Sequence, residues 1–230
     1  MPPPELLAEL KAWLPQQRWY GARSAPAGEI GELDRLGPAR LIEIGAPPAR
    51  YLLTALDTEA QRQPWFTLMA NAARLPGARG ELVFEPLQPL GPAPASHLLG
   101  AEQSNTSIRF GDWLLKLIRR LYPGENPDFE VPHALAAHTG FRHLAAPGGR
   151  VLYRGGEAAY TLAVLQPFIA NHGDGWEWVR ARLKQDAGPG ALAAELRQLG
   201  RRTAELHAAL AAVGGLPDFA PEPVAAADLE

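Results

Sequence analysis

The alternation of polar and apolar residues before Lys116 constrains the fold of this chain more than any other feature. Ile108 and Phe110 are apolar, whereas Ser107 and Arg109 are polar. A period of two residues indicates a half-buried β-hairpin. The returning strand reads Trp-Leu-Leu-Lys-Leu-Ile and contains a single charged side chain, Lys116. A bare ammonium group is costly to bury without an anionic partner, so we expect Lys116 to bind an anion.

The turn of this hairpin is predicted to be a polar segment, and its residue types suggest which anion. It contains the residues Gln103, Ser104, Asn105, Thr106 and Ser107. Their hydroxyl, amide and backbone N–H groups can surround phosphate oxygens. We therefore expect this segment and Lys116 to bind a nucleotide phosphate together.

Composition excludes several other classes of protein. The chain has 230 residues and a net charge of −3, which gives no overall electrostatic case for nucleic acid or for an anionic membrane. Cysteine is absent, so disulfides and thiolate metal sites are excluded. The first residues do not resemble a signal peptide, and no apolar run reaches membrane-spanning length. We predict a cytoplasmic α/β or α+β protein without a membrane or nucleic-acid partner.

Residues 1–90 are predicted to form a small, mainly β cap domain. A helix is expected over residues 5–14, ending at Pro15. Short β-like runs follow, separated by Gly and Pro, at residues 40–44, 51–57, 65–69 and 82–84. The Pro-rich residues 86–95 read as a semi-rigid boundary.

Residues 91–170 are predicted to form the nucleotide-binding domain. After Lys116, a helix is expected to begin with Asp128 as its N-cap and Glu130 in its first turn. A second hairpin joins residues 151–153 to residues 158–165. The chain from residue 171 onward is predicted to be helical, with helices over residues 175–183 and 191–212.

The order of these elements matches the N-lobe of a kinase. In that layout a lysine binds the α- and β-phosphates, and a helix glutamate holds the lysine. Lys116 and Glu130 have the required types and order, although the polar segment is not G-x-G-x-x-G. The alternatives are a strand-end lysine that reaches solvent and an acid that is solvated at a helix start. The order of the two residues favours the kinase interpretation.

Several segments resemble the bacterial maltokinase family. They are WLPQQRWYG (residues 13–21), GAEQSNTS (100–107), LKLIRRL (115–121), PGENPDFEV (123–131), LQPFIANHGDGW (165–176) and LGRRTAELH (199–207). Members of that family have a fold similar to aminoglycoside phosphotransferases and protein kinases. They use ATP and Mg²⁺ to convert maltose into maltose 1-phosphate, which feeds α-glucan and glycogen synthesis from trehalose. They are often fused to trehalose synthase, or work beside it.

The resemblance implies an α+β fold: a protein-kinase-like N-lobe preceded by a cap and followed by the first C-lobe helices. It makes Gln103 to Ser107 the loop that covers ATP, Lys116 the phosphate ligand and Glu130 its partner. It also makes Gln166 to Ile169 the hinge that meets adenine through its backbone. Gln166 and Phe168 are therefore candidate nucleotide-binding residues.

One segment imitates a catalytic loop. His172-Gly173-Asp174 has the H-G-D pattern of phosphotransferases, but Val179 stands where an asparagine should bind Mg²⁺. We interpret it as a turn after the hinge. We expect neither a catalytic residue nor a metal ligand within this chain, the Mg²⁺ ligands lying elsewhere, and we expect the chain to be inactive alone. Two alternatives stay open: a non-catalytic module that docks trehalose synthase, and the N-lobe of a related sugar or amino-sugar kinase.

Overall fold

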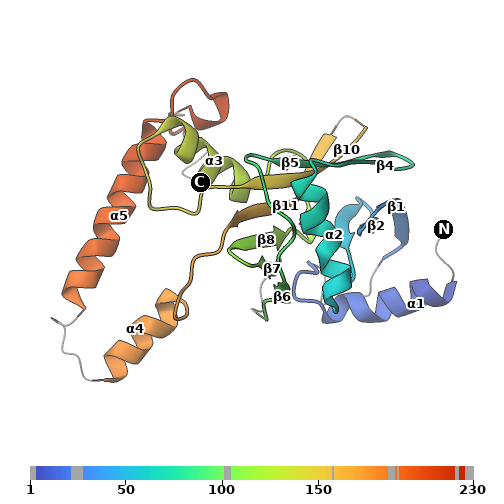
Figure 1. Cartoon of the computed structure of the whole chain (residues 1–230), viewed down its shortest axis with the longest axis horizontal. Coiled ribbons are helices and arrows are strands. Elements are labelled where there is room, and N and C mark those ends of the chain that lie inside the picture. Colours follow the sequence, from blue (N-terminus) through green and yellow to red (C-terminus); the bar gives the residue numbers. More distant parts are fainter. Residues whose placement is uncertain are drawn as a thin grey trace. The chain divides into compact units, whose positions relative to one another are not determined.

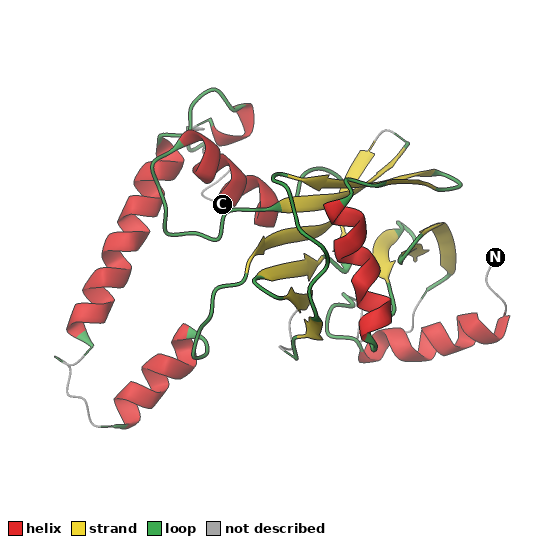
Figure 2. Ribbon diagram, in the orientation of Figure 1, coloured by secondary structure: helices red, strands yellow, loops and turns green. Residues whose placement is uncertain are grey.

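The computed structural model of the chain describes residues 4–21, 28–100, 105–156, 158–185, 190, 192–220 and 223–225. It contains two compact units (Figures 1 and 2). The first unit comprises residues 1–130 and 146–168, and the second comprises residues 131–145 and 169–230. The described residues form a mixed α/β protein with five α-helices.

A seven-stranded antiparallel sheet forms the centre of the first unit. Its strand order is β4-β5-β10-β11-β8-β7-β6. The strands are β4 (Arg74–Pro76), β5 (Gly80–Pro86), β6 (Ser96–Leu98), β7 (Thr106–Phe110), β8 (Trp113–Leu117), β10 (Gly149–Gly155) and β11 (Ala158–Pro167). The predicted hairpin β10–β11 is confirmed, and Lys116 lies on a strand, β8, as expected. The turn predicted at Gln103–Ser107 is wrong for Thr106 and Ser107, which lie in β7; the turn that joins β7 to β8 is Gly111-Asp112. Of the polar segment, Asn105 directly precedes β7, Thr106 and Ser107 are its first two residues, and Gln103 and Ser104 lie outside the described residues.

A second, four-stranded sheet has the order β1-β2-β3-β9. Its strands are β1 (Ile30–Leu36), β2 (Ala39–Ile44), β3 (Ala49–Leu53) and β9 (Arg120–Leu121). Three of these strands come from the N-terminal 90 residues, and β9 directly follows the lysine strand. The predicted boundary at residues 86–95 lies between β5 and β6, which belong to the same seven-stranded sheet.

The N-terminal residues also contain more helix than the sequence pattern indicated. Helix α1 (Pro4–Trp13) continues into a 3₁₀ turn, η1 (Leu14–Gln16), and α2 spans Glu59–Ala70. The β-run predicted at residues 65–69 is therefore wrong. Thr58 and Gln61 form a capping box, in which each side chain bonds to the backbone N–H of the other residue, and this starts α2.

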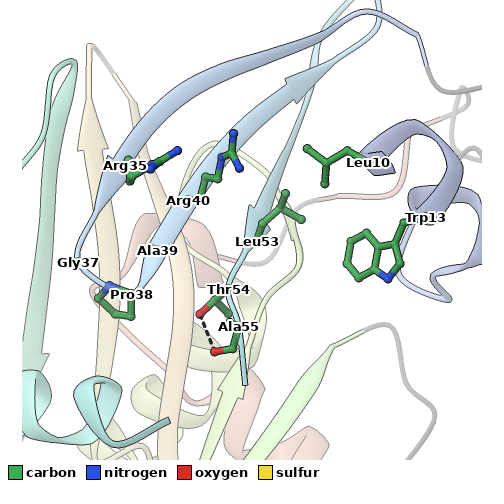
Figure 3. Close-up of a pocket in the computed structure, with 10 residues that line it drawn as sticks. All are labelled: Leu10, Trp13, Arg35, Gly37, Pro38, Ala39, Arg40, Leu53, Thr54 and Ala55. Carbon is green, nitrogen blue, oxygen red and sulfur yellow. Dashed lines mark hydrogen bonds between the residues drawn. The ribbon is translucent and has the colours of Figure 1, made fainter. Parts of the chain in front are cut away.

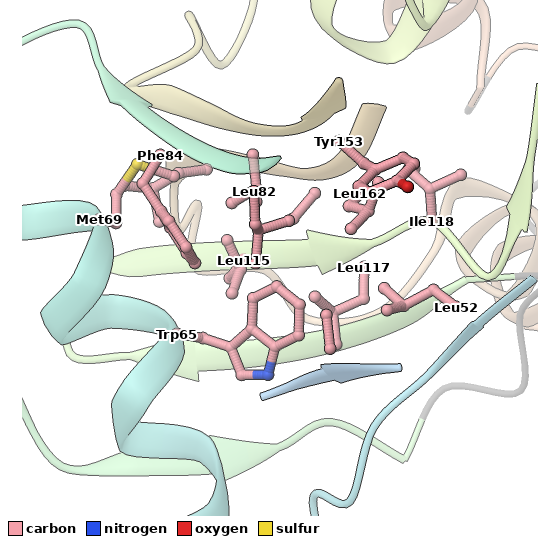
Figure 4. Packing of buried hydrophobic residues seen from close by; sticks show 14 of the residues in the cluster. Leu52, Trp65, Met69, Leu82, Phe84, Leu115, Leu117, Ile118, Tyr153 and Leu162 are labelled. Carbon is pink, nitrogen blue, oxygen red and sulfur yellow. The ribbon is translucent and has the colours of Figure 1, made fainter. Parts of the chain in front are cut away.

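Apolar side chains between α2 and the two sheets form the main core (Figure 4). Helix α2 contacts β5, β6 and β10. Trp65 and Met69 of α2 are fully buried, as is Phe84 of β5. The same cluster includes Leu115 and Leu117 of the lysine strand, so the core-facing side of β8 is fixed by packing.

One buried carboxylate links three parts of the first unit. Asp34 of β1 is only 4% exposed. Its Oδ1 accepts the backbone N–H groups of Arg35 and Ala78, both at 2.9 Å. Its Oδ2 accepts the N–H of Arg79 at 3.0 Å and the hydroxyl of Tyr153 at 3.2 Å. Asp34 thus fastens β1 to the β4–β5 turn and to β10.

Helix α3 (Pro127–His138) begins one residue earlier than predicted. Its cap is Asn126, whose Oδ1 accepts the N–H of Asp128 at 2.9 Å. The carbonyl of Asn126 accepts the N–H groups of Phe129 and Glu130. The prediction that Asp128 is the N-cap is therefore wrong, and the carboxylate of Asp128 is available for another role.

The regular elements described in the second unit are helices, joined by loops. Helices α4 (Gly175–Lys184) and α5 (Ala193–Ala211) agree with the predicted segments, and a 3₁₀ turn, η2, spans Pro217–Phe219. Asp174 caps α4 through a 2.7 Å bond from the N–H of Glu177. This contact supports the interpretation of His172-Gly173-Asp174 as a turn that leads into a helix.

Candidate functional site

The side of β8 that carries Leu114 and Lys116 is partly exposed, in contrast to its core-facing side. Lys116 lies directly opposite Ser107 of β7 and Val164 of β11. Residues opposite each other in antiparallel strands share one face of the sheet. Ser107 and Lys116 are each partly exposed, whereas Leu115 and Leu117 are buried. The strand register therefore places a hydroxyl beside the lysine at the end of the polar segment.

Lys116 is paired with an acid from helix α3. Its Nζ lies 2.6 Å from Oδ2 of Asp128. The lysine side chain is 26% exposed and the aspartate side chain is 44% exposed, so both reach solvent. From the sequence we predicted that an acidic residue of this helix holds the lysine, and we assigned that role to Glu130. Lys116 forms an ion pair with Asp128. Glu130, two residues further along α3, also has an interaction, and its role as a partner of Lys116 stays a prediction.

A second set of contacts holds the start of α3 against the sheet. Arg150 of β10 pairs with Glu85 of β5 at 2.8 Å and with Glu125, which precedes α3. Its guanidinium also lies 4.6 Å from the ring centroid of Phe129. These contacts place Asp128 between two anchored neighbours. The position of the Lys116 partner is thus fixed by the sheet as well as by the helix.

The backbone after β11 is held by the β7–β8 turn. The N–H of Phe168 donates to the carbonyl of Asp112 at 2.7 Å. The guanidinium of Arg109 lies 4.0 Å from the Phe168 ring centroid and donates to the carbonyl of Gly111. Because the Phe168 N–H already has a partner, adenine recognition by this segment would depend on its other backbone groups. Gln166 of β11 lies opposite Leu114 of β8, and Leu114 lies two residues before Lys116 on the same strand.

The start of β7 contacts a buried arginine. The Thr106 hydroxyl accepts a 2.8 Å hydrogen bond from Nε of Arg119, which is 7% exposed. Sequence reasoning did not identify Arg119, because nothing in the pair Arg119-Arg120 distinguishes the buried residue from the exposed one. It assigned Asp128 as a helix N-cap and not as the partner of Lys116. Asn105 is partly buried, whereas Gln103 and Ser104 lie outside the described residues.

Cavities are also found in the N-terminal part of the first unit. Figure 3 shows one of about 390 Å³, lined by Leu10, Trp13, Arg35, Gly37, Pro38, Ala39, Arg40, Leu53, Thr54 and Ala55. A neighbouring cavity of about 810 Å³ shares Gly37, Pro38, Thr54 and Ala55 with it. Neither lining includes Lys116 or Asp128. These cavities are therefore separate from the lysine site.

The described residues were also searched for metal-binding groups and for membrane-spanning helices. They contain no group of three or more His, Cys, Asp or Glu side chains that could hold a metal ion. None of their helices is long and apolar enough to cross a membrane. We therefore assign no metal ligand to this part of the chain.

Glucosamine kinases are among the known proteins similar to this chain. No family model matches the sequence. A curated glucosamine kinase from Streptacidiphilus jiangxiensis is 29% identical over 196 residues, which cover 80% of this chain and 40% of that protein. A solved glucosamine kinase in complex with glucosamine, ADP and inorganic phosphate is 25% identical, with a TM-score of 0.54. That match covers 92% of this chain and 53% of the solved chain.

Another crystal form of glucosamine kinase, crystal form B, has a TM-score of 0.55 at 24% identity and covers 91% of this chain and 51% of that one. The chain thus spans about half the length, or less, of the relatives that it matches. Its mixed α/β fold is similar to that of glucosamine kinases. These relatives support the alternative of a related sugar or amino-sugar kinase better than the maltokinase interpretation.

Proposed function

We propose that this chain is the nucleotide-binding, N-terminal part of an ATP-dependent sugar kinase, and that an amino sugar is the acceptor of the whole protein. The observation that carries the proposal is the ion pair between Lys116 and Asp128 beside Ser107. A lysine held by an acid of the following helix is the arrangement by which kinases position a phosphate ligand. The similarity to glucosamine kinases supports the choice of acceptor class.

The residues around Lys116 suit a nucleotide. Lys116 and Ser107 offer an ammonium and a hydroxyl on one face, and Asn105 and Thr106 complete the described end of the polar segment. Leu114 lies two residues before Lys116 on the same face and is partly exposed, so we assign it an apolar contact with adenine. ATP would supply the phosphoryl group. The role of this part of the chain is to bind the nucleotide and to hold its phosphates.

The proposal is tested by titrating the 230-residue chain with ATP and following the heat of binding. Lys116→Met should weaken ATP binding at least tenfold, because the variant loses the cation that contacts phosphate. Lys11→Met removes an exposed lysine from α1 and serves as the matched control. An ATP affinity that is the same in Lys116→Met and in the unchanged chain would refute the assignment of Lys116.

Maltose is the second candidate acceptor. It is favoured by the maltokinase-like segments at residues 100–107 and 123–131, which include the polar segment and the start of α3. Phosphoryl transfer from ATP should therefore be measured with glucosamine and maltose in parallel, in a protein that includes this chain. Faster transfer to maltose would assign the acceptor to the second candidate.

A further inference from the structure

Two arginines of the N-terminal sheet lie directly opposite each other, Arg35 on β1 and Arg40 on β2. Opposite residues of antiparallel strands share one face of the sheet, and like charges at such a pair of positions are destabilising. Glu32 of β1 offsets one of the two charges, since its Oε2 lies 2.6 Å from Nε of Arg40 and 3.2 Å from Nη2 of Arg35. Two positive charges and one negative charge leave a positive charge in excess on this face.

The guanidinium of Arg40 is only partly satisfied by the protein. Its Nε donates to Glu32, whereas its Nη2 is buried and has no hydrogen-bond partner among the described residues. A buried donor without an acceptor is costly. The side chain as a whole is 18% exposed, so part of it can still be reached from outside. An anion bound beside Arg35 and Arg40 would offset the excess charge and offer acceptor oxygens to both guanidinium groups.

Both arginines line the cavity of Figure 3, whose other walls are largely apolar. These walls include Leu10 and Trp13 of α1 and Leu53 of β3. Trp13 is 42% exposed, although it is one of the largest apolar side chains in the protein. The cavity therefore combines two cations with an aromatic and aliphatic surface that a ligand can reach.

The neighbouring cavity of about 810 Å³ continues this apolar surface. It shares residues 37–38 and 54–55 with the first cavity, and its own lining includes Pro64 and Leu68 of α2 and Leu75 of β4. No charged side chain is found among the described residues that line it. The positive charge thus belongs to the first cavity, while the second offers only apolar and neutral polar contacts.

We propose that the two adjoining cavities bind a small amphiphilic carboxylate. Its carboxylate pairs with Arg35 and Arg40, and its alkyl body lies on Trp13 and Leu53 and extends into the second cavity. Volumes of about 390 and 810 Å³ fall within the range of small-molecule sites, which span about 300–1,000 Å³ and combine apolar walls with a few polar groups. The inference does not depend on the proposed function, because neither lining includes Lys116.

The test follows the indole N–H signal of Trp13 in NMR spectra of the 230-residue chain at neutral pH, with the signal assigned by Trp13→Phe. Octanoate is the probe, octanamide has the same alkyl chain without the charge, and acetate has the charge without the chain. Octanoate should shift the Trp13 signal saturably and bind at least about tenfold more tightly than octanamide or acetate. From butyrate to octanoate, each added CH₂ group should tighten binding about threefold.

Arg35 offers a variant that should not disturb folding, because its side chain is 64% exposed. Arg35→Gln should weaken octanoate binding about threefold and octanamide binding by less than about twofold. Arg74→Gln is the matched control: Arg74 is 58% exposed, pairs with Glu81 at 3.1 Å and lines neither cavity, so neither affinity should change. Arg40→Gln removes the more buried guanidinium and should weaken octanoate binding about tenfold.

Three results would overturn the proposal. They are equal affinities for octanoate and octanamide, a Trp13 signal that does not shift at about 20 mM octanoate, and the same octanoate affinity in Arg35→Gln as in Arg74→Gln. Circular dichroism checks that Arg40→Gln is folded, and if it is not, Arg35→Gln still decides the role of the charge. Because no nucleotide is added, the outcome is independent of the test of Lys116.

Discussion

Replacement of Asp34 by asparagine should be among the most destabilising single changes in the first unit. The carboxylate accepts four hydrogen bonds, two at each oxygen. Asparagine keeps one oxygen and places an NH₂ group against two donors, so about two bonds are lost and two donors remain unsatisfied. At about 1.5–3 kcal/mol for each bond to a charged group, the expected loss in the free energy of unfolding is about 3–6 kcal/mol.

The pH dependence of stability provides an independent check. Burial raises the pKa of Asp34, but the hydrogen bonds from the N–H groups of Arg79, Ala78 and Arg35 and from the Tyr153 hydroxyl together lower it below the usual 3.8. A lowered pKa in the folded state means that the stabilisation is complete above pH 3.8 and is lost as the pH falls through the folded-state pKa. The difference between the unchanged chain and Asp34→Asn should therefore shrink only in acid.

The assay is urea unfolding followed by tryptophan fluorescence, to which the buried Trp65 contributes. Glu32→Gln is the matched control, because Glu32 lies on the same strand and forms ion pairs with Arg35 and Arg40 nearer the surface. The control should lose about 0–1 kcal/mol. An Asp34→Asn variant as stable as the control would refute the account of Asp34 as a four-fold acceptor.

Three further predictions concern single contacts. Burial raises the pKa of Tyr153 to about 12. The stability contributed by its protonated form is therefore present below pH 10 and is lost as the pH rises towards 12. In urea unfolding, Tyr153→Phe should remove this alkaline loss of stability. Thr58→Ala removes the capping box with Gln61 and should lower the free energy of unfolding by about 1 kcal/mol, measured in the same way, whereas an unchanged value would show that α2 does not need the cap. Asp128→Asn breaks the exposed ion pair with Lys116 and should cost less than about 1 kcal/mol of stability, with a difference that disappears at high salt.

Local patterns predicted that Lys116 lies on a strand of a hairpin, but they placed the turn at Gln103–Ser107 instead of at Gly111-Asp112. From Ser107 to Phe110 of β7, partly exposed and buried side chains alternate, and that alternation is visible in the sequence. Helix α2 was missed because Trp65 to Met69 is a short apolar run, which periodicity cannot assign to strand or helix. The signal that could have found it is the capping box at Thr58, seven residues upstream.

The partner of Lys116 was harder to predict than the lysine. Moving the helix start by one residue, from Asp128 to Pro127, changes Asp128 from a cap into a first-turn residue whose carboxylate faces the sheet. Such a shift is within the normal uncertainty of helix ends. Arg119 could not have been found in this way, since its burial depends on β3, more than sixty residues earlier in the chain.

The pairing of β5 with β10 has a consequence for any attempt to produce the proposed nucleotide-binding part without the first 90 residues. The two strands pair along the whole of β10, from Gly149 opposite Pro86 to Gly155 opposite Gly80. A shortened chain beginning at residue 91 would leave β10 with a row of unpaired N–H and C=O groups beside the apolar side chains of Val151 and Tyr153. Exposed apolar edges of this kind pair with other chains, so the shortened protein should aggregate.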